Sequence, residues 1–221
     1  MIAVIDYGVG NLFSLCSSLK YIGADVTVTS DAEQIRKADR IILPGVGAFA
    51  DAIDKLRSKG LDEVIKAEAA AGKDMMGICL GMQLLFEKSY EYGEHEGLGL
   101  LKGSVVPMEG NLPEGLKIPH IGWNQLEFTK EHRLLSKINE GDCVYFVHSY
   151  YAQDCDDSLI AATDYGRKIT ALEPFSSSFL ESSSTGPHSM TFARQCRAQV
   201  GIPPAATRSS HISQKLVGKG K

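Results

Sequence analysis

The sequence lacks the features that direct a chain to a membrane or to nucleic acid. It has no uninterrupted apolar run near the roughly 20 residues that span a bilayer. Its first residues, Met1–Asp6, lack the basic flank and long apolar core of a signal peptide. A net charge of −4 gives no basic excess for phosphate contacts. We therefore expect neither a membrane nor nucleic acid as a partner.

Paired cysteines are also missing. The chain has five cysteines, an odd number, and none of them form a C-x-x-C pair. Disulfide frameworks and zinc sites both need paired or clustered cysteines. The sequence therefore predicts reduced thiols, no metal site and a cytoplasmic location.

What the sequence does contain is an alternation of short β-rich segments with helical ones, in 221 residues of which 43% are hydrophobic. Strands are expected at 2–6, 26–29, 40–43 and from 75 onward, and helices at 12–22, 31–38, 48–59 and 61–71. This order predicts one α/β domain, a mostly parallel sheet with helices on both faces. A smaller β-rich section is expected from short strand patterns at 104–106, 125–128, 143–147, 159–163 and 168–171.

The apolar run Met75–Phe86 begins like a buried strand and continues like a helix, with Cys79 at the change. Gly77 and Gly81 flank the cysteine with the spacing of a G-x-S-x-G nucleophile elbow, in which small neighbours permit a strained strand-to-helix turn. The helix that follows would direct its N-terminal dipole at the sulfur and favour the thiolate. The alternative is a buried structural cysteine.

A second candidate ligand loop, Pro44–Gly47, directly follows a predicted strand. Open α/β sheets bind their ligands beyond the carboxyl ends of the strands. The two glycines of this loop let the backbone approach a substrate or turn a peptide N–H toward it. An earlier loop, Tyr7–Asn11, contains G-x-G without the third glycine of a dinucleotide fingerprint and is read as a tight turn.

Taken together, these segments resemble the class I, triad-type glutamine amidotransferases. Within that group they are similar to the glutaminase subunits of imidazole glycerol phosphate synthases, enzymes of histidine biosynthesis. Four segments in the same order carry the resemblance, which covers residues 1–171: Asp6–Asn11, Pro44–Gly47, Pro119–Asn124 and Tyr145–Tyr151. Val46 and the Gly122–Asn124 segment disfavour the amidotransferases of anthranilate or GMP synthesis.

The resemblance implies a reaction and a partner. Cys79 would attack the side-chain amide of glutamine to form a thioester, and the ammonia would pass to a cyclase subunit, without a cofactor. The backbone N–H groups of Leu80 and Val46 would stabilise the oxyanion. A peptide flip allowed by Gly45 and Gly47 would form this oxyanion hole, so Gly45→Pro is expected to leave the fold intact and to cut glutamine turnover by orders of magnitude.

Further roles also follow from the resemblance. Glutamine would be bound by Gly47, Gln83, Glu91, Ser149 and Tyr150. The cyclase would be contacted by Trp123, Asn124 and Tyr145. The structural alternatives are an exposed helix position for Gln83, a solvated loop charge for Glu91 and a core position for Trp123. His120 and His148 are expected to be structural, with His148 orienting the glutamine loop rather than acting as the base.

The triad itself is incomplete in the printed residues. The family's His-Pro-Glu motif, which activates the cysteine, occurs nowhere in the sequence. Residues 172–221 carry a net charge of +4 and ten serines, whereas residues 1–171 carry −8. We interpret 172–221 as a divergent, disordered tail, from a frameshift or a lineage-specific ending. His188 is a poor surrogate base, so a catalytically impaired partner-binding subunit is the alternative function.

Overall fold

The computed structural model describes residues 1–173 and begins with a parallel sheet. Its four strands lie in the order β2-β1-β3-β4 and all run in the same direction. They are β1 (Ile2–Ile5), β2 (Val26–Thr29), β3 (Arg40–Leu43) and β4 (Asp74–Gly77). The carboxyl ends of β1, β3 and β4 therefore meet at one edge, where the Tyr7, Pro44 and Cys79 segments leave the sheet.

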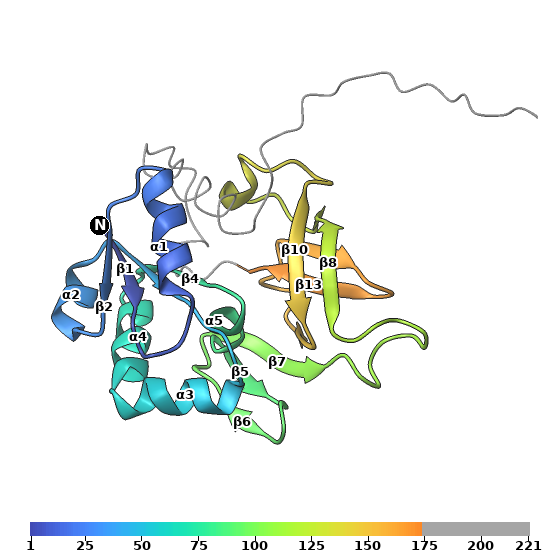
Figure 1. Cartoon of the computed structure of the whole chain (residues 1–221), viewed down its shortest axis with the longest axis horizontal. Coiled ribbons are helices and arrows are strands. Elements are labelled where there is room, and N and C mark those ends of the chain that lie inside the picture. The colour runs from blue at the N-terminus through green and yellow to red at the C-terminus, as the bar shows by residue number, and fades with distance from the viewer. Residues whose placement is uncertain (174–221) are drawn as a thin grey trace, which may run out of the picture.

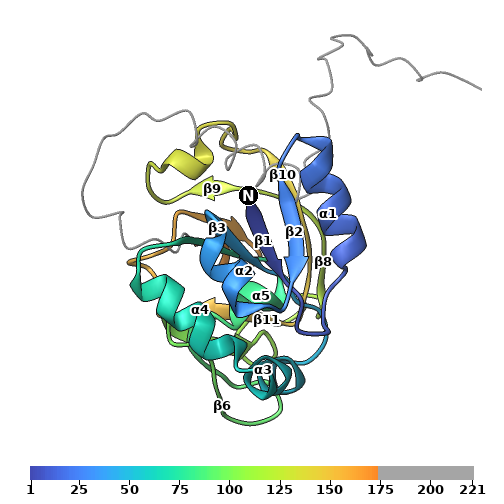
Figure 2. The same cartoon turned by 90° about the vertical axis from the view of Figure 1, so that its left-hand side faces the viewer.

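Helices cover both faces of this sheet (Figures 1 and 2). The helices are α1 (Leu12–Tyr21), α2 (Ala32–Lys37), α3 (Phe49–Ser58) and α4 (Leu61–Ala70). Ile2 and Val4 of β1 pack in the cluster that includes α1, whereas Ala3 and Ile5 pack in the cluster that includes α2, α3 and α4. This alternation follows from the two-residue period of a strand and confirms the predicted α/β class.

The helix boundaries follow from local side-chain chemistry. Asp31 caps α2, because its carboxylate accepts hydrogen bonds from the N–H groups of Glu33 at 2.7 Å and Gln34 at 3.2 Å. Asn11 caps α1 in the same way through the N–H of Ser14. Between Ser30 and Asp31, the two caps that the sequence offered for α2, the structure selects Asp31.

The rest of the described chain, up to residue 173, forms the β-rich section, in three further sheets with orders β11-β7-β5-β6, β10-β8 and β13-β12-β9 (Figure 1). The strands are β5 (Phe86–Ser89), β6 (His95–Glu96), β7 (Leu101–Pro107), β8 (His120–Gln125), β9 (Glu127–Phe128), β10 (Cys143–His148), β11 (Tyr150–Gln153), β12 (Ala161–Asp164) and β13 (Lys168–Leu172). A single 3-10 turn, Arg133–Leu135, lies between β9 and β10.

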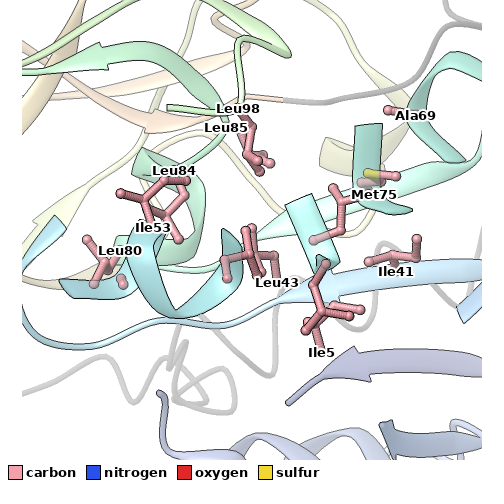
Figure 3. Packing of buried hydrophobic residues seen from close by; sticks show 14 of the residues in the cluster. Ile5, Ile41, Leu43, Ile53, Ala69, Met75, Leu80, Leu84, Leu85 and Leu98 are labelled. Carbon is pink, nitrogen blue, oxygen red and sulfur yellow. The ribbon is translucent and has the colours of Figure 1, made fainter. Parts of the chain in front are cut away.

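The predicted helix after Cys79 is wrong in length. Helix α5 spans only Leu80–Gln83, and the chain returns to a strand at Phe86. Leu84, Leu85 and Phe86 are all buried, and a run that is buried on every side has no periodicity to distinguish helix from strand. Leu80 and Leu84 lie beside Ile53, and Leu85 lies beside Leu98 (Figure 3). All of them belong to the cluster that also contains Leu43, so the turn is anchored in the main core.

The strand predicted at 125–128 is also wrong, since Leu126 interrupts it. Strand β8 before this residue pairs with β10, and β9 after it pairs with β12. The main chain of Leu126 instead bonds Asp142 and Gly141. Strands β5, β6 and β11 had no sequence prediction, because their residues lie in segments interpreted as helix, loop or motif.

The first two residues of the predicted tail lie within the described part of the chain. Leu172 completes β13, and the Ser158 hydroxyl donates to the carboxylate of Glu173 at 3.0 Å. The predicted disorder of the rest of the tail, and the position of His188, fall outside the described residues. Among the described helices, none is long and apolar enough to cross a membrane.

Candidate functional site

Cys79 lies at a strained turn between β4 and α5. Its backbone has φ 54° and ψ −120°, in the positive-φ region that residues other than glycine rarely adopt. Two backbone hydrogen bonds fix the turn, from Ile78 N–H to the Leu43 carbonyl and from Gly81 N–H to the Ile78 carbonyl, both 3.0 Å. The strained turn predicted from the sequence is therefore present. Cys79 is exposed, which excludes the buried structural alternative.

The two flanking glycines are required by close packing. A Cβ atom on Gly81 would lie 1.9 Å from the Leu43 carbonyl oxygen, and one on Gly77 would lie 2.3 Å from the Met82 Cα. Both distances are far below a van der Waals contact. The elbow can therefore form against β3 only with glycine at these positions.

The Pro44–Gly47 loop packs directly on this elbow. A Cβ on Gly45 would lie 2.6 Å from the Gly81 backbone nitrogen and 3.0 Å from the Tyr7 hydroxyl. The expectation that Gly45→Pro spares the fold is therefore wrong, because any side chain there collides with backbone. Gly47 differs, with φ 98° and open space around its Cα, and Val46 is half exposed.

The surroundings of Cys79 do not favour its thiolate. Although Cys79 reaches the surface, the protein atoms packed around its sulfur displace water and raise the pKa of the thiol above its ordinary value, and a hydrogen bond from the Leu80 N–H opposes the shift only in part. Within residues 1–173, no histidine or carboxylate is hydrogen-bonded to this thiol. The sequence predicted a lowered pKa from the helix dipole, but α5 is a single turn and gives a small dipole.

Gln83 and Tyr150 come together beside the elbow, although 67 residues separate them. The Gln83 side-chain amide donates to the Tyr150 carbonyl at 3.4 Å, so Gln83 is not an ordinary exposed helix position. Ser149 precedes β11, and its carbonyl accepts a 2.9 Å hydrogen bond from the Met108 N–H. The main-chain carbonyls of Ser149 and Tyr150 are therefore both held by hydrogen bonds, from Met108 and from Gln83.

Glu91 is held at the start of a helix. Its carboxylate accepts a 2.5 Å hydrogen bond from the N–H of Phe49, the first residue of α3, which has no other side-chain cap. Such a position stabilises a negative charge. Glu91 also lies close enough to contribute to the raised pKa of Tyr150, after the larger effect of burial. The alternative of a solvated loop charge is therefore wrong.

Trp123 and Tyr145 lie opposite each other on β8 and β10, with ring centroids 5.5 Å apart. Ile121 and Val147 form the next pair on the same face, and all four side chains are about half exposed. We call these four residues the aromatic face. A core position for Trp123 is excluded. Asn124 is displaced by one residue along β8, so its side chain points to the opposite face of the ribbon.

On that opposite face Asn124 joins two histidines. The His120 ring lies 2.8 Å from Asn124 Oδ1 and 3.1 Å from the His148 ring, and His148 Nδ1 lies 2.8 Å from the Tyr150 carbonyl. His148 thus contacts Tyr150, in the segment that the sequence predicts it to orient. Burial lowers its pKa to about 4, so the ring is neutral at neutral pH.

Sequence reasoning missed Tyr7. This residue is fully buried at the end of β1, and its hydroxyl donates a 2.6 Å hydrogen bond to the Pro44 carbonyl. Burial raises the pKa of Tyr7, and so does the nearby Cys79. The signal was present at the start of the Tyr7–Asn11 loop, where a large polar aromatic follows the four apolar residues of β1 after one intervening residue, Asp6.

The sequence of this chain matches a known protein family. Residues 3–177 match the family model described as glutamine amidotransferase class-I. The imidazole glycerol phosphate synthase subunit HisH of Caldanaerobacter subterraneus subsp. tengcongensis is 53% identical over 173 residues, 78% of this chain and 83% of that relative. The subunit HisH of Aquifex aeolicus is 53% identical over 165 residues, 74% of this chain and 78% of the relative.

Solved structures agree at the level of the fold. PurLQS from Thermotoga maritima matches with a TM-score of 0.59 over 89% of this chain and 95% of that chain, at 18% identity. A crystal structure of a glutamine amidotransferase matches with a TM-score of 0.58 over 73% and 80% of the two chains, at 16% identity. At such identities the likeness shows the α/β fold alone.

Proposed function

The chain belongs to the class-I glutamine amidotransferase family, and from this premise we propose that it is the glutaminase subunit of an imidazole glycerol phosphate synthase. In that role it hydrolyses glutamine to glutamate and ammonia and delivers the ammonia to a cyclase subunit in histidine biosynthesis. The observation that carries the proposal is the strained elbow at Cys79, packed against the Pro44–Gly47 loop.

In the proposed reaction the Cys79 sulfur attacks the side-chain carbonyl carbon of glutamine. The C–N bond breaks, the amide nitrogen takes up the thiol proton and leaves as ammonia, and water then cleaves the thioester to release glutamate. The N–H of Leu80, already aimed at the sulfur, supports its role as an oxyanion donor. Val46 N–H is proposed as the second donor, with Gly47 allowing the peptide to turn.

The glutamine would lie between the elbow and the start of β11. The Gln83–Tyr150 contact and the fixed Ser149 carbonyl support the proposal that these residues bind the amino-acid end of the substrate. Glu91 supports the site indirectly, because it holds the start of α3 beside Tyr150.

The aromatic face is the proposed docking surface for the cyclase subunit. Trp123 and Tyr145 are paired, exposed and flanked by two further apolar side chains. Exposed aromatic residues of this kind often supply most of the binding energy at protein interfaces. The reduced state of the described cysteines supports a cytoplasmic location for the complex.

A second candidate function is a partner-binding subunit with impaired chemistry. The observation that favours it is the raised pKa of the Cys79 thiol, in a sequence that contains no His-Pro-Glu motif. Without a base, the thiolate is scarce and no group returns a proton to the departing nitrogen. The rate would then fall by several powers of ten.

Glutamate release from glutamine, measured with the cyclase subunit and its nucleotide ligand present, separates the two functions. Turnover that disappears in Cys79→Ala and persists in Cys16→Ala supports the glutaminase. Cyclase binding without Cys79-dependent turnover supports the binding subunit. Absence of both binding and turnover would overturn the proposed function.

A further inference from the structure

A continuous line of side-chain contacts runs from β8 to the start of β11. It passes from Asn124 Oδ1 to His120 Nε2 at 2.8 Å, from His120 Nδ1 to His148 Nε2 at 3.1 Å, and from His148 Nδ1 to the Tyr150 carbonyl at 2.8 Å. The same Tyr150 carbonyl accepts the Gln83 side-chain amide. The line therefore ends beside the elbow that carries Cys79.

The His120 ring, in the middle of this line of contacts, is held in one orientation. The His120 ring is almost completely buried, and it is stacked between the rings of Tyr165 at 3.9 Å and Phe146 at 4.9 Å, with interplanar angles of 18° and 16°. The stacking fixes the plane of the ring, and the contacts with Asn124 and His148 fix which edge each nitrogen occupies, since a half-turn of the ring would lose both contacts. Only the positions of the protons are free to change.

The two rings have too few protons for the three contacts. Asn124 Oδ1 and the Tyr150 carbonyl are acceptors, so the outer contacts need N–H groups at His120 Nε2 and His148 Nδ1. A neutral imidazole carries one N–H, and the two facing nitrogens would then both present lone pairs across 3.1 Å. Burial lowers the pKa of His148 to about 4, so His148 binds no second proton at neutral pH.

The Asn124 amide is oriented by a second contact. Its Nδ2 donates to the Asp164 carbonyl at 3.5 Å, and the reversed amide would direct an oxygen at that carbonyl. Asn124 Oδ1 therefore keeps His120 in the tautomer that carries its proton on Nε2. The single proton of His148 must therefore serve the two other contacts, one with His120 Nδ1 and one with the Tyr150 carbonyl.

We propose that His148 is a tautomeric switch with two states of similar free energy. In one state His148 Nδ1–H donates to the Tyr150 carbonyl, and the contact between the two histidines has no proton. In the other state His148 Nε2–H donates to His120 Nδ1, and His148 no longer holds the Tyr150 carbonyl. One proton leaves to water and another arrives from water, so the net charge is the same in both states.

Asn124 sets the position of this switch. If its amide reverses, the NH₂ group donates to His120 Nε2, His120 moves its proton to Nδ1 and donates to His148, and His148 donates to Tyr150. All three contacts are then made with two protons. Because Asn124 follows Trp123 on β8, a partner that binds the aromatic face can reverse the amide and fix the Tyr150 carbonyl. This coupling of partner binding to the His148 tautomer rests on the proposed function, whereas the tautomers of the free chain do not.

Long-range proton–nitrogen NMR spectra of the full chain, labelled with ¹⁵N in its histidines and recorded at neutral pH, test the switch. We expect His120 as the Nε2–H tautomer and His148 as an average of both tautomers. In Asn124→Leu, both rings should become Nδ1–H. His132 is an internal control, because its Nδ1 accepts the Leu134 N–H at 3.2 Å and it should stay Nε2–H. Gln125→Leu, on the exposed end of the same strand, should change neither ring.

Two NMR results would overturn the proposal: Nδ1–H on both rings of the unaltered chain, or a single His148 tautomer that Asn124→Leu does not change. Adding the cyclase subunit should move His148 to Nδ1–H. If the cyclase binds and the tautomers stay as they were, the coupling is wrong. If the cyclase does not bind, the docking role fails and the coupling with it, while the spectra of the free chain still decide the switch.

Discussion

The Tyr7 hydroxyl donates a 2.6 Å hydrogen bond to the Pro44 carbonyl and joins the ends of β1 and β3 beneath Cys79. Both partners are buried, so water cannot replace the lost donor. Tyr7→Phe should therefore lower the free energy of unfolding by about 1–3 kcal/mol, measured by urea denaturation followed by circular dichroism. Tyr165→Phe removes an exposed bond of similar length to the Lys117 carbonyl and should cost less. Equal losses would contradict the structural role of Tyr7.

The close approach of the elbow to β3 gives a second prediction. Gly81→Ala places a methyl group 1.9 Å from the Leu43 carbonyl oxygen, and backbone must move to admit it. We expect a loss of at least about 3 kcal/mol, or failure to fold. Gly99→Ala is the control for a methyl group that meets no neighbour: Gly99 has open space and a positive φ of 66° that Gly81 lacks, and the backbone strain alone should cost about 1–2 kcal/mol. Similar melting temperatures for both variants would show that the elbow is less tightly packed.

The sequence predicted the parallel half of the fold and the turn at Cys79 because both depend on local patterns. Strand β2 and the α2 cap need only neighbouring residues, and the glycines at the elbow reflect a single turn. The short helix α5 could not be predicted, because Leu84 and Phe86 are buried on all sides and show no period.

The rest of the site depends on contacts between distant residues. The bond from Glu91 to Phe49 and the bond from Gln83 to Tyr150 span 42 and 67 positions. A local sequence pattern does not indicate which distant residues form hydrogen bonds with each other. The raised pKa of Cys79 is likewise a property of packing, and it reverses the direction that the helix dipole alone indicated.

The raised pKa predicts how Cys79 reacts. Only the thiolate is alkylated, so the rate of Cys79 carboxamidomethylation by iodoacetamide should rise with pH and still be rising above pH 8.5, the ordinary value of a free cysteine. Peptide mass spectrometry of the full chain gives the rate at each pH, with Cys79→Ser to assign the modified site. A rate that is already constant near pH 7 would instead indicate an activated thiolate.

A substitution on the aromatic face should weaken cyclase binding without lowering the stability of the fold. Trp123→Ala removes a half-exposed ring that lies tilted against Tyr145, so the free energy of unfolding should change little. Cyclase affinity should instead fall by at least about tenfold, or 1.4 kcal/mol. Isothermal titration calorimetry measures the affinity. Phe13→Ala, another exposed aromatic, on α1 rather than on β8 or β10, is the control, and an equal loss of affinity there would contradict the assigned surface.

Glu173 predicts a pH dependence of stability. Burial raises the pKa of its carboxyl from 4.5 to about 7, against weaker opposing hydrogen bonds from Cys155 and Ser158. Asp156 adds to the shift and Lys130 reduces it. One carboxylate oxygen is buried without a hydrogen-bond partner within the described chain, so the ionised form is the costly one.

The direction of this pH dependence follows from the number of protons bound to Glu173 in the folded and unfolded states. Between pH 4.5 and 7 the folded state keeps a proton on Glu173 that the unfolded state has released, so stability should fall as pH rises through this interval, by about 2–3 kcal/mol. Glu173→Gln cannot ionise and should remove this part of the slope in urea titrations from pH 5 to 8. Glu127→Gln, at an exposed position of β9, should leave the slope unchanged. If Glu173→Gln retains the full slope, the buried carboxyl does not titrate in this range and its contact with Ser158 does not persist in solution.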